Sequence, residues 1–529
     1  MLLSIIHCNL FTNLVYYTIF EFLNYIEFGA DMLFNSFLFI FIFLPLTLIG
    51  WYLLNHFERY ELAKVFLAGM SLWFYGYFNV YYLAIIVVSI AVNYLLSWLL
   101  THARTKLANR AGLFVGLLFN LGLLFYFKYY DFFIENLNLA FHADFTLKHI
   151  LLPLGISFFT FQQLSFIIDR CLGRAEHYSF INYVTFVTFF PQLIAGPIVL
   201  YKEMIPQFED TANRKLNAQN FSQGIVLFVL GLGKKILLAD VLALVVNYGF
   251  AQTFSLDTPS TVLVILAYTF EIYFDFSGYS DMAMGLGRMF NIILPVNFNS
   301  PYRACSVKEL WQRWHMTLSR FFVTYVYIPL GGSKKGKLRT ILNTIVIFFL
   351  SGLWHGAAWT YIAWGTMQGL LVVWDNLGIV GIKGRAEKHP AKFHIPAWLG
   401  WILTFGFFNL SLFFFRSESM AGAIQMFRNL GAMNYTGKMF EVASTLDIPE
   451  FYVIKEALGI MAPQLTGYAY LGLLLFYLAL SFFMITRKNV LEIAKNGKLT
   501  SGKCWAVTAV FVWCVISLSQ VSTFLYFNF

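Results

Sequence analysis

The chain has 529 residues, of which 59% are apolar, 19% aromatic and only 12% charged, and its mean hydropathy is +0.67. Soluble domains of this length are not so apolar, and disordered, collagen-like and disulfide-scaffold proteins are excluded as well. The net charge of +9 must lie in short loops because so little of the chain is polar, which favours cytoplasmic loops over nucleic-acid binding. Five cysteines without CxxC spacing indicate neither a disulfide framework nor a metal site.

The first strong apolar segment begins at Met32 and continues to residue 54. Residues 1–31 contain several Asn and Glu residues and are predicted to be a weak, dispensable extension. A signal peptide is not expected there, because the first Lys or Arg of the chain is Arg59.

Further apolar windows follow along the rest of the chain, and many approach the ~20 residues that cross a hydrocarbon core. They lie at residues 62–78, 80–100, 111–127, 150–168, 180–200, 222–247, 260–294, 340–376, 397–415, 467–486 and 505–525. We therefore predict an all-α polytopic membrane protein with roughly 11 to 13 transmembrane helices. Residues 32–529 are expected to form a single membrane domain.

Several of these windows are too long or too interrupted to be single helices. Gly76 and Asn79 predict a hairpin, Pro191 and Pro197 predict a kink, and Gly365 is expected to turn the chain between two passes. Breaks at membrane depth require surrounding protein, so they favour an internal cavity. By the positive-inside rule, the basic loops face the cytoplasm, and the segments of mixed charge face outward. These basic loops are 55–64, 101–110, 169–178, 302–339, 382–392 and 487–498, and the segments of mixed charge are 128–149, 201–220 and 416–466.

The richest polar stretch covers residues 297–339. Residues 307–322 are predicted to form one amphipathic helix, with Ser306 as its N-cap and Glu309 at the capping-box position. The simplest interpretation places this helix in the cytoplasmic interface, with its tryptophans at headgroup level. That geometry does not explain why His315 lies on the apolar stripe.

A second histidine, His355, lies in the strongly apolar stretch 343–365 and is predicted to sit inside a membrane helix. It follows Arg339 by ~24 Å at 1.5 Å per residue, which is within the bilayer. Ionisable residues at that depth usually mark a functional site, although a structural histidine bonded to a neighbouring helix is the alternative. Small or aromatic residues are expected one turn away or in a GxxxG pair, namely Ser351, Gly352, Gly356 and Trp359.

A third polar cluster lies in residues 271–290, where acids occur in an otherwise apolar stretch. Asp281 is expected to pair with Arg288 or with another helix, so a structural ion pair is at least as favoured as catalysis. Asp275, Tyr279 and Asp281 are therefore predicted to support the site.

An imidazole can remove a proton from a hydroxyl as that hydroxyl attacks an acyl carbonyl. The sequence resembles the membrane-bound O-acyltransferase family, specifically its bacterial alginate O-acetyltransferase branch. The resemblance covers nearly everything from Met32 onward. It is carried by WQRWHMTLSRFF, YIPLGGSKKG, LWHGAAWTYIAWG, FPQLIAGPI, FDFSGYSDMAMGLGRMF, FNSPYRA and the terminal FLYFNF.

The resemblance implies a ring of tilted helices around a thin core, with a cytoplasmic opening for an acyl thioester and an outer opening for the acceptor. It makes His355 the catalytic residue and His315 a second active-site residue, within a catalytic segment 297–365. Substrate-binding or tunnel residues are then expected around the two histidines, namely Trp311, Arg313, Trp314, Ser351, Gly352, Trp354 and Trp359.

The expected function is transfer of acetyl groups across the bacterial inner membrane for O-acetylation of an extracytoplasmic, alginate-like polysaccharide. Acetyl-CoA is the expected donor, no cofactor is expected to be bound permanently, and membrane lipids surround the chain. The resemblance also implies a periplasmic partner of the SGNH-hydrolase type that completes the transfer. Peptidoglycan O-acetylation and teichoic-acid D-alanylation are the enzymatic alternatives, and a transporter or a scaffold for polysaccharide export is the non-enzymatic one.

Overall fold

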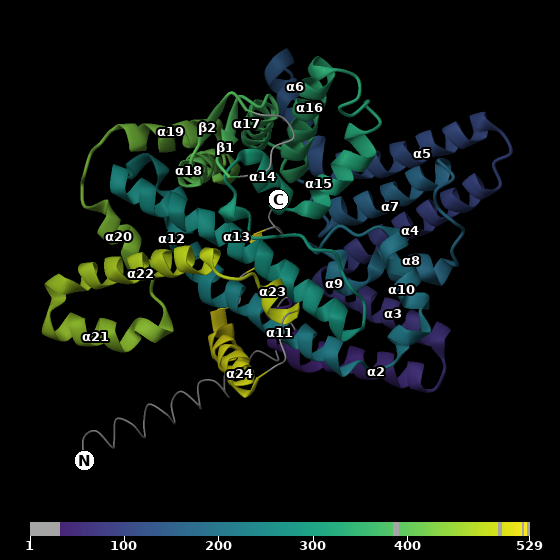
Figure 1. Ribbon diagram of the computed structural model, residues 1–529, viewed down its shortest axis with the longest axis horizontal. Coiled ribbons are helices and arrows are strands. Elements are labelled where there is room, and N and C mark those ends of the chain that lie inside the picture. The colour runs from purple at the N-terminus through teal and green to yellow at the C-terminus, as the bar shows by residue number, and fades with distance from the viewer. Residues whose placement is uncertain (1–31, 385–390, 496–499, 521–522, 526–529) are drawn as a thin grey trace.

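The computed structural model describes residues 32–384, 391–495, 500–520 and 523–525, and its regular structure is almost entirely helical (Figure 1). Within that part of the chain, the only strands are β1 (Val380–Ile382) and β2 (Phe393–Ile395), which form a short parallel pair. The extension predicted at residues 1–31 lies outside the described residues.

Seven helical segments among the described residues are long and apolar enough to cross a membrane. They confirm an all-α, multi-pass membrane protein. These segments are Phe39–His56, which contains α2 (Leu44–His56); α4 (Val80–Thr101); Lys106–Phe141, which contains α5 (Lys106–Leu124), the π-helical turn η2 (Phe125–Tyr129) and α6 (Tyr130–Phe141); α13 (Thr258–Met289); α16 (Lys337–His355); α18 (Ala397–Arg416); and Pro463–Thr486, which contains α22 (Thr466–Thr486).

The remaining helices are shorter, less apolar or interrupted, and they complete the bundle around these spans. They are α3 (Tyr60–Phe78), α7 (Ile156–Cys171), α8 (Phe180–Thr188), α9 (Phe190–Leu193), α10 (Tyr201–Glu209), α11 (Ala218–Lys234), α12 (Asp240–Ala251), α14 (Val307–Arg313), α15 (Met316–Phe322), α17 (Trp359–Asn376), α19 (Met420–Gly431), α20 (Lys438–Ser444), α21 (Tyr452–Met461), α23 (Val490–Lys495) and α24 (Ser501–Ile516).

Two of the predicted helix breaks occur where the sequence places them. Helix α3 ends at Phe78, and the side chain of Asn79 caps α4 by accepting a hydrogen bond from the Tyr81 backbone N–H at 2.8 Å. The segment around Pro191 breaks into α8 and the single turn α9. The turn predicted at Gly365 is wrong, because Gly365 lies inside α17 and the chain turns earlier, between α16 and α17.

Helix α13 runs through the centre of the molecule and packs against α11 along its length (Figure 1). Glycines allow this approach: a Cβ at Gly231 would lie 2.7 Å from the Gly278 carbonyl oxygen, and one at Gly224 would lie 2.6 Å from that of Gly285. Small residues at such interfaces let two backbones pack closely where apolar burial alone gives little preference in a membrane.

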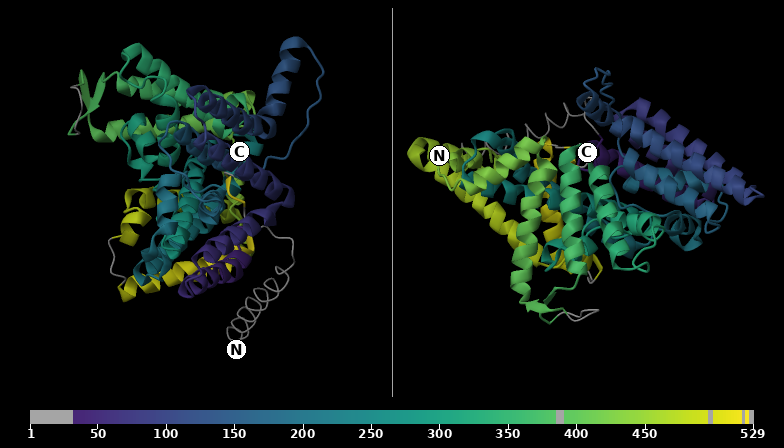
Figure 2. Two further views of the ribbon diagram at one scale, coloured as in Figure 1. Left: turned by 90° about the vertical axis from the view of Figure 1, so that its right-hand side faces the viewer. Right: turned by 90° about the horizontal axis from the view of Figure 1, so that it is seen from above.

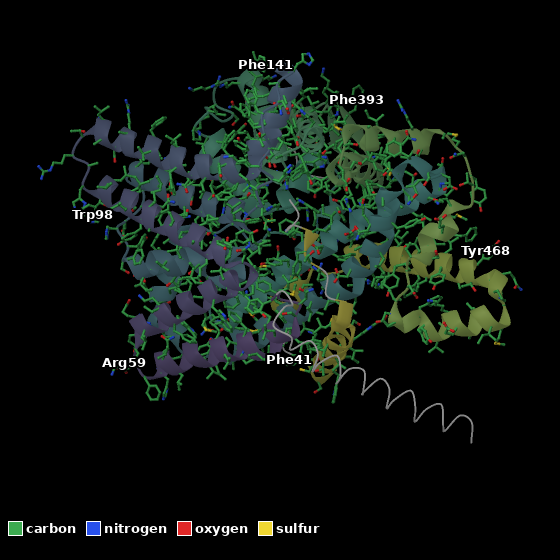
Figure 3. All side chains as sticks on the ribbon, turned by 180° about the vertical axis from the view of Figure 1, so that it is seen from behind. Phe41, Arg59, Trp98, Phe141, Phe393 and Tyr468 are labelled. Carbon is green, nitrogen blue, oxygen red and sulfur yellow. The ribbon has the colours of Figure 1, made fainter. Side chains whose placement is uncertain are left out.

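The periphery of the molecule is rich in exposed apolar side chains, as a lipid-facing surface requires. Figure 3 labels several side chains at the rim, including Trp98, Phe141 and Phe393, which are 45%, 73% and 66% exposed. Both views in Figure 2 place the β1–β2 pair and the loop after α6 on opposite sides of the molecule. Residues 128–141 of the segment predicted to face outward form the end of η2 and the whole of α6.

Candidate active site

His355 is the last residue of α16, whereas the sequence predicted a position inside a longer helix. The helix ends there because Gly356 is extended, with φ −161° and ψ 149°, and α17 begins three residues later. An apolar window contains no signal for this turn, because the turn depends on how α16 and α17 pack. As a result, the imidazole lies at a helix end, where the backbone opens toward a cavity.

Glycines bring α16 and α17 into direct backbone contact below His355. A Cβ at Gly352 would lie 2.4 Å from the Tyr361 carbonyl oxygen, and one at Gly365 would lie 2.4 Å from that of Phe348. At Gly356 the Tyr361 ring occupies the place of a side chain, 2.1 Å from an ideal Cβ. The close backbone approach predicted at Gly352 is therefore confirmed, and it fixes the position of the turn that carries His355.

His315 lies in a break between α14 and α15, so the single helix predicted over 307–322 is wrong. Its backbone is left-handed, with φ 43°, and the following Met316 N–H donates to the Asn297 carbonyl oxygen at 2.9 Å. The interfacial placement is also wrong, because His315 is 1% exposed and Trp314 is 4% exposed. Local periodicity could not reveal the break, since the segment around Asn297 holds it open.

Asn297 orients the His315 ring. Its side-chain Oδ1 lies 3.0 Å from His315 Nδ1 and also accepts hydrogen bonds from the Thr317 hydroxyl at 2.9 Å and the Thr317 backbone N–H at 3.4 Å. Burial lowers the pKa of His315 to about 3, so the ring is neutral near pH 7. An amide oxygen only accepts, so Nδ1 must carry the proton and Nε2 keeps the lone pair that a general base needs.

The structure brings the two histidines together inside an aromatic enclosure. The ring centroids of His315 and His355 lie 6.5 Å apart, and Trp354 packs on both rings at 5.8 Å and 4.9 Å. Phe276 covers the other side of His315 at 4.8 Å, and Phe415 covers His355 at 5.3 Å. This enclosure excludes bulk water from two imidazoles that a small bound group could contact together.

The other predicted tunnel residues divide into two groups. Ser351, Gly352 and Trp354 are buried on α16 near His355. Trp311 is one layer further out, because its ring packs at 5.6 Å on Trp364, whose own ring lies 5.2 Å from His355.

The second group of predicted tunnel residues contacts side chains other than those of the two histidines. Arg313 forms an ion pair with Glu309 at 3.0 Å, and Trp314 packs on Phe298 and Phe408. Trp359, expected one helical turn beyond His355, instead begins α17 and is 55% exposed.

Two acids of α13, Asp275 and Asp281, are paired with lysines from α11 and the adjoining turn. Lys234 contacts Asp281 at 2.6 Å, and Lys235 contacts Asp275 at 2.7 Å and Asp240 at 2.8 Å. The pairing expected between Asp281 and Arg288 is wrong, since the Arg288 guanidinium donates to the Gln223 side chain at 2.7 Å. Tyr279 stacks on Phe34 at 4.9 Å.

A polar cavity of about 460 Å³ lies beside the enclosure. Its wall includes Ala358, three residues after His355, and Arg416, which directly follows Phe415. The Phe415 ring contacts the rings of both His355 and Tyr361, at 5.3 Å and 5.1 Å. Among the described residues, no hydrogen-bond partner satisfies the buried Glu271 Oε2 or Thr360 Oγ1, both in the cavity wall. The charged and polar residues around it are Lys235, Asp240, Asn247, Glu271, Asp275, Thr360, Tyr361, Arg416, Ser417, Glu418 and Thr523.

Sequence reasoning missed three residues that shape the site: Asn297, Phe415 and Lys128. Asn297 stands at the start of a polar stretch, and that was its only signal. Phe415 is one aromatic residue among several in an apolar helix, so its contact with His355 has no sequence signature. Lys128 is a lone basic residue after a long apolar run, which is a detectable signal of a buried cation.

Comparisons with known proteins agree with this architecture. Residues 172–417, which include both histidines, match the family model described as MBOAT, membrane-bound O-acyltransferase family. The peptidoglycan O-acetyltransferase of Helicobacter pylori is 37% identical and is matched over 94% of this chain and 98% of its own length. The probable alginate O-acetylase of Pseudomonas putida is 35% identical, over 94% of this chain and 100% of its own length. The teichoic acid D-alanyltransferase of Streptococcus thermophilus is 30% identical and is matched over 42% of this chain and 56% of its own length.

Proposed function

The chain belongs to the membrane-bound O-acyltransferase family and is an acyltransferase, and we propose that it acetylates hydroxyl groups of a bacterial cell-envelope polysaccharide. The single observation that carries this proposal is the pairing of His315 and His355, 6.5 Å apart in an enclosure beside a polar cavity. We propose acetyl-CoA in the cytoplasm as the donor and the bacterial inner membrane as the location.

In the proposed reaction, His355 acts as the general base. Its neutral imidazole takes the proton of an attacking hydroxyl while the hydroxyl oxygen bonds to the acetyl carbonyl carbon. The carbon–sulfur bond of the thioester then breaks, and the proton passes to the leaving thiolate. A transient acetyl group on His355 is the alternative route to the same products. His315, held with its Nε2 lone pair free of the proton, would orient the reacting group.

The polar cavity suits the acceptor side of this reaction. Carboxylates such as Glu271 accept hydrogen bonds from sugar hydroxyls, and Arg416 can donate to ring or hydroxyl oxygens. The Phe415 ring separates this polar wall from His355. Such a barrier suits an enzyme that must keep a thioester away from water until an acceptor arrives.

Two acceptors are supported by full-length relatives. An alginate-like exopolysaccharide is supported by the Pseudomonas putida relative, and peptidoglycan is supported by the Helicobacter pylori relative, each matched over nearly its whole length. Teichoic-acid D-alanylation has less support, since that relative is matched over 56% of its length.

We further propose a periplasmic partner of the SGNH-hydrolase type that passes the acetyl group to the polymer. This proposal predicts that cells lacking the partner still cleave acetyl-CoA through this chain but contain polymer without O-acetyl groups. Polymer acetylation that persists in such cells would remove the need for a partner.

The test measures O-acetyl content by NMR in purified exopolysaccharide and in purified peptidoglycan from cells whose only copy is wild type, His355→Ala or His315→Ala. His102→Ala is the matched control, because His102 is an exposed histidine that contacts Trp98 at a helix end. Immunoblots of the membrane fraction establish equal protein levels.

Loss of acetyl groups from one polymer in the His355 variant, with His102→Ala unchanged, would support the proposal and identify the acceptor. Unchanged acetylation of both polymers in His355→Ala, at normal protein levels, would refute the catalytic assignment.

A further inference from the structure

The terminal carbonyl groups of the last turn of α16, which carries His355, accept hydrogen bonds from side chains elsewhere in the chain. A helix leaves its last carbonyls without intrahelical partners, and these groups need donors from elsewhere when they are buried. The Gly352 carbonyl still accepts from the Gly356 N–H at 3.3 Å. The carbonyls of Leu353, Trp354 and His355 depend on another part of the chain.

Two consecutive residues of the π-helical turn η2 supply all three donors. The Lys128 ammonium donates to the Trp354 carbonyl oxygen at 2.5 Å and to the His355 carbonyl oxygen at 3.2 Å. The Tyr129 hydroxyl donates to the Leu353 carbonyl oxygen at 2.9 Å. Single π-helical turns inside α-helices occur frequently at functional sites, and this one presents two adjacent side chains to one helix end.

Lys128 is a half-buried cation beside the candidate active site, and no ion pair joins it to a carboxylate among the described residues. Its Nζ lies 5.8 Å from the Trp354 ring centroid, and its side chain lines a small cavity of about 30 Å³ together with Trp354 and His355. Two of the three ammonium N–H groups are used by the carbonyls, which leaves one donor.

The charge of Lys128 matters because of the direction of α16. A helix C-terminus carries roughly half a negative charge, which disfavours anions nearby. Attack on an acyl carbonyl develops negative charge on the carbonyl oxygen, and enzymes place positive groups or donors where that charge appears. A histidine at a helix C-terminus would therefore catalyse acyl transfer in an unfavourable field unless a cation offsets it.

We propose that Lys128 is a positioning residue of this acyltransferase: it fixes the turn that carries His355 and reverses the charge of that helix end. This inference rests on the proposed role of His355. It assigns Tyr129 a purely structural part, because its hydroxyl caps the neighbouring carbonyl without adding charge.

The experiment measures release of free CoA from acetyl-CoA by the purified full-length protein in detergent, with soluble alginate and peptidoglycan fragments added in parallel as acceptors, together with its thermal unfolding midpoint. The variants are Lys128→Met, Lys128→Gln and Lys128→Arg, with Tyr129→Phe as the matched capping control and His355→Ala as the reference. Gln keeps an N–H donor without charge, and Arg keeps both.

We expect kcat to fall by about a hundredfold in Lys128→Met and Lys128→Gln at unchanged KM, because a displacement of about 1 Å in a group that positions the reacting atoms can cost about 10²-fold in rate. Lys128→Arg should recover most of kcat. The kcat of Tyr129→Phe should remain within about twofold of wild type, although its unfolding midpoint should fall about as much as that of Lys128→Met. If Lys128→Met does not accumulate, Lys128→Gln carries the comparison.

Wild-type turnover in Lys128→Gln would overturn the inference, because charge would then be unnecessary. A loss in Tyr129→Phe equal to that in Lys128→Met would overturn it as well, because capping alone would explain both. Wild-type turnover in His355→Ala would instead refute the proposed function. If His355→Ala loses turnover while Lys128→Met keeps wild-type turnover, only the role of Lys128 is refuted.

Discussion

The side-chain Oδ1 of Asn297 lies 3.0 Å from Nδ1 of His315, and this contact determines which nitrogen of the ring carries the proton. The two residues are 18 positions apart and meet because the backbone breaks between α14 and α15. The same carbonyl oxygen holds Thr317, so one amide fixes both the ring and the start of α15.

Asn297→Leu should therefore lower turnover more than it lowers stability. Without the amide oxygen, the His315 ring can rotate or change tautomer, and a displacement of about 1 Å in a group that orients the reacting atoms can cost about a hundredfold in rate. We expect a loss of at least about tenfold in CoA release by purified protein. Thr317→Val, which removes the hydroxyl bond to Asn297 and the acceptor of the Ile198 backbone N–H but leaves the His315 contact in place, is the comparison and should lose less activity. Equal activity in wild type and Asn297→Leu would show that the tautomer of His315 is irrelevant.

Phe415→Ala should make thioester cleavage independent of an acceptor. The Phe415 ring contacts the rings of both His355 and Tyr361, which lies on the cavity wall, so removal of the Phe415 ring opens a path for water to the enclosure. We expect acceptor-independent CoA release to rise while polymer acetylation falls. Phe414→Ala is a matched control, because the Phe414 ring faces Phe427 on α19 instead. A Phe415 variant with the wild-type ratio of cleavage to acetylation would contradict the assignment.

Gly352→Ala should force α16 and α17 apart. The added Cβ would meet the Tyr361 carbonyl oxygen at 2.4 Å, and backbone atoms cannot move aside as a flexible side chain can. Overpacking of this kind costs about 1–3 kcal/mol, and the shift should also displace His355 and reduce turnover. Gly472→Ala in α22, where an ideal Cβ has no neighbour within 4 Å, should be neutral or stabilising. Unfolding midpoints and CoA release of both variants test this contrast.

Lys234→Met should destabilise the core because it leaves Asp281 buried without its cation. Removing one partner of a buried pair costs about 3–5 kcal/mol, whereas replacing both partners by apolar residues is often neutral. The double variant Lys234→Met, Asp281→Leu should thus unfold closer to wild type than the single variant does. Lys455→Met, which breaks a more exposed pair with Asp447, should change stability by less than about 1 kcal/mol. Equilibrium unfolding in mixed micelles provides the measurement. A double variant with a lower free energy of unfolding than the single variant would contradict this prediction.

Local sequence features determined the ends of several helices and the class of the protein. Asn79 and the proline at 191 interrupt helices wherever the rest of the chain lies, because a cap and a missing N–H act within a few residues. The apolar windows likewise identify membrane spans from composition alone, since the bilayer requires about 20 apolar residues per helix.

Local features failed where a distant segment decides the backbone. The helix predicted through His315 is broken by contacts with Asn297, and the turn predicted at Gly365 lies instead after His355 because glycines lock α16 against α17. Apolar periodicity carries no information about such contacts, so both errors have the same origin.

The sequence by itself thus determined a helical membrane acyltransferase with two notable histidines, because apolar length and residue motifs are local properties of the chain. Only the tertiary structure brought His315 and His355 into one aromatic enclosure, placed Phe415 before a polar cavity, and set Lys128 on carbonyls 226 and 227 residues away. Those relationships depend on how helices pack across the whole chain, and packing is decided by contacts between residues that no short segment contains.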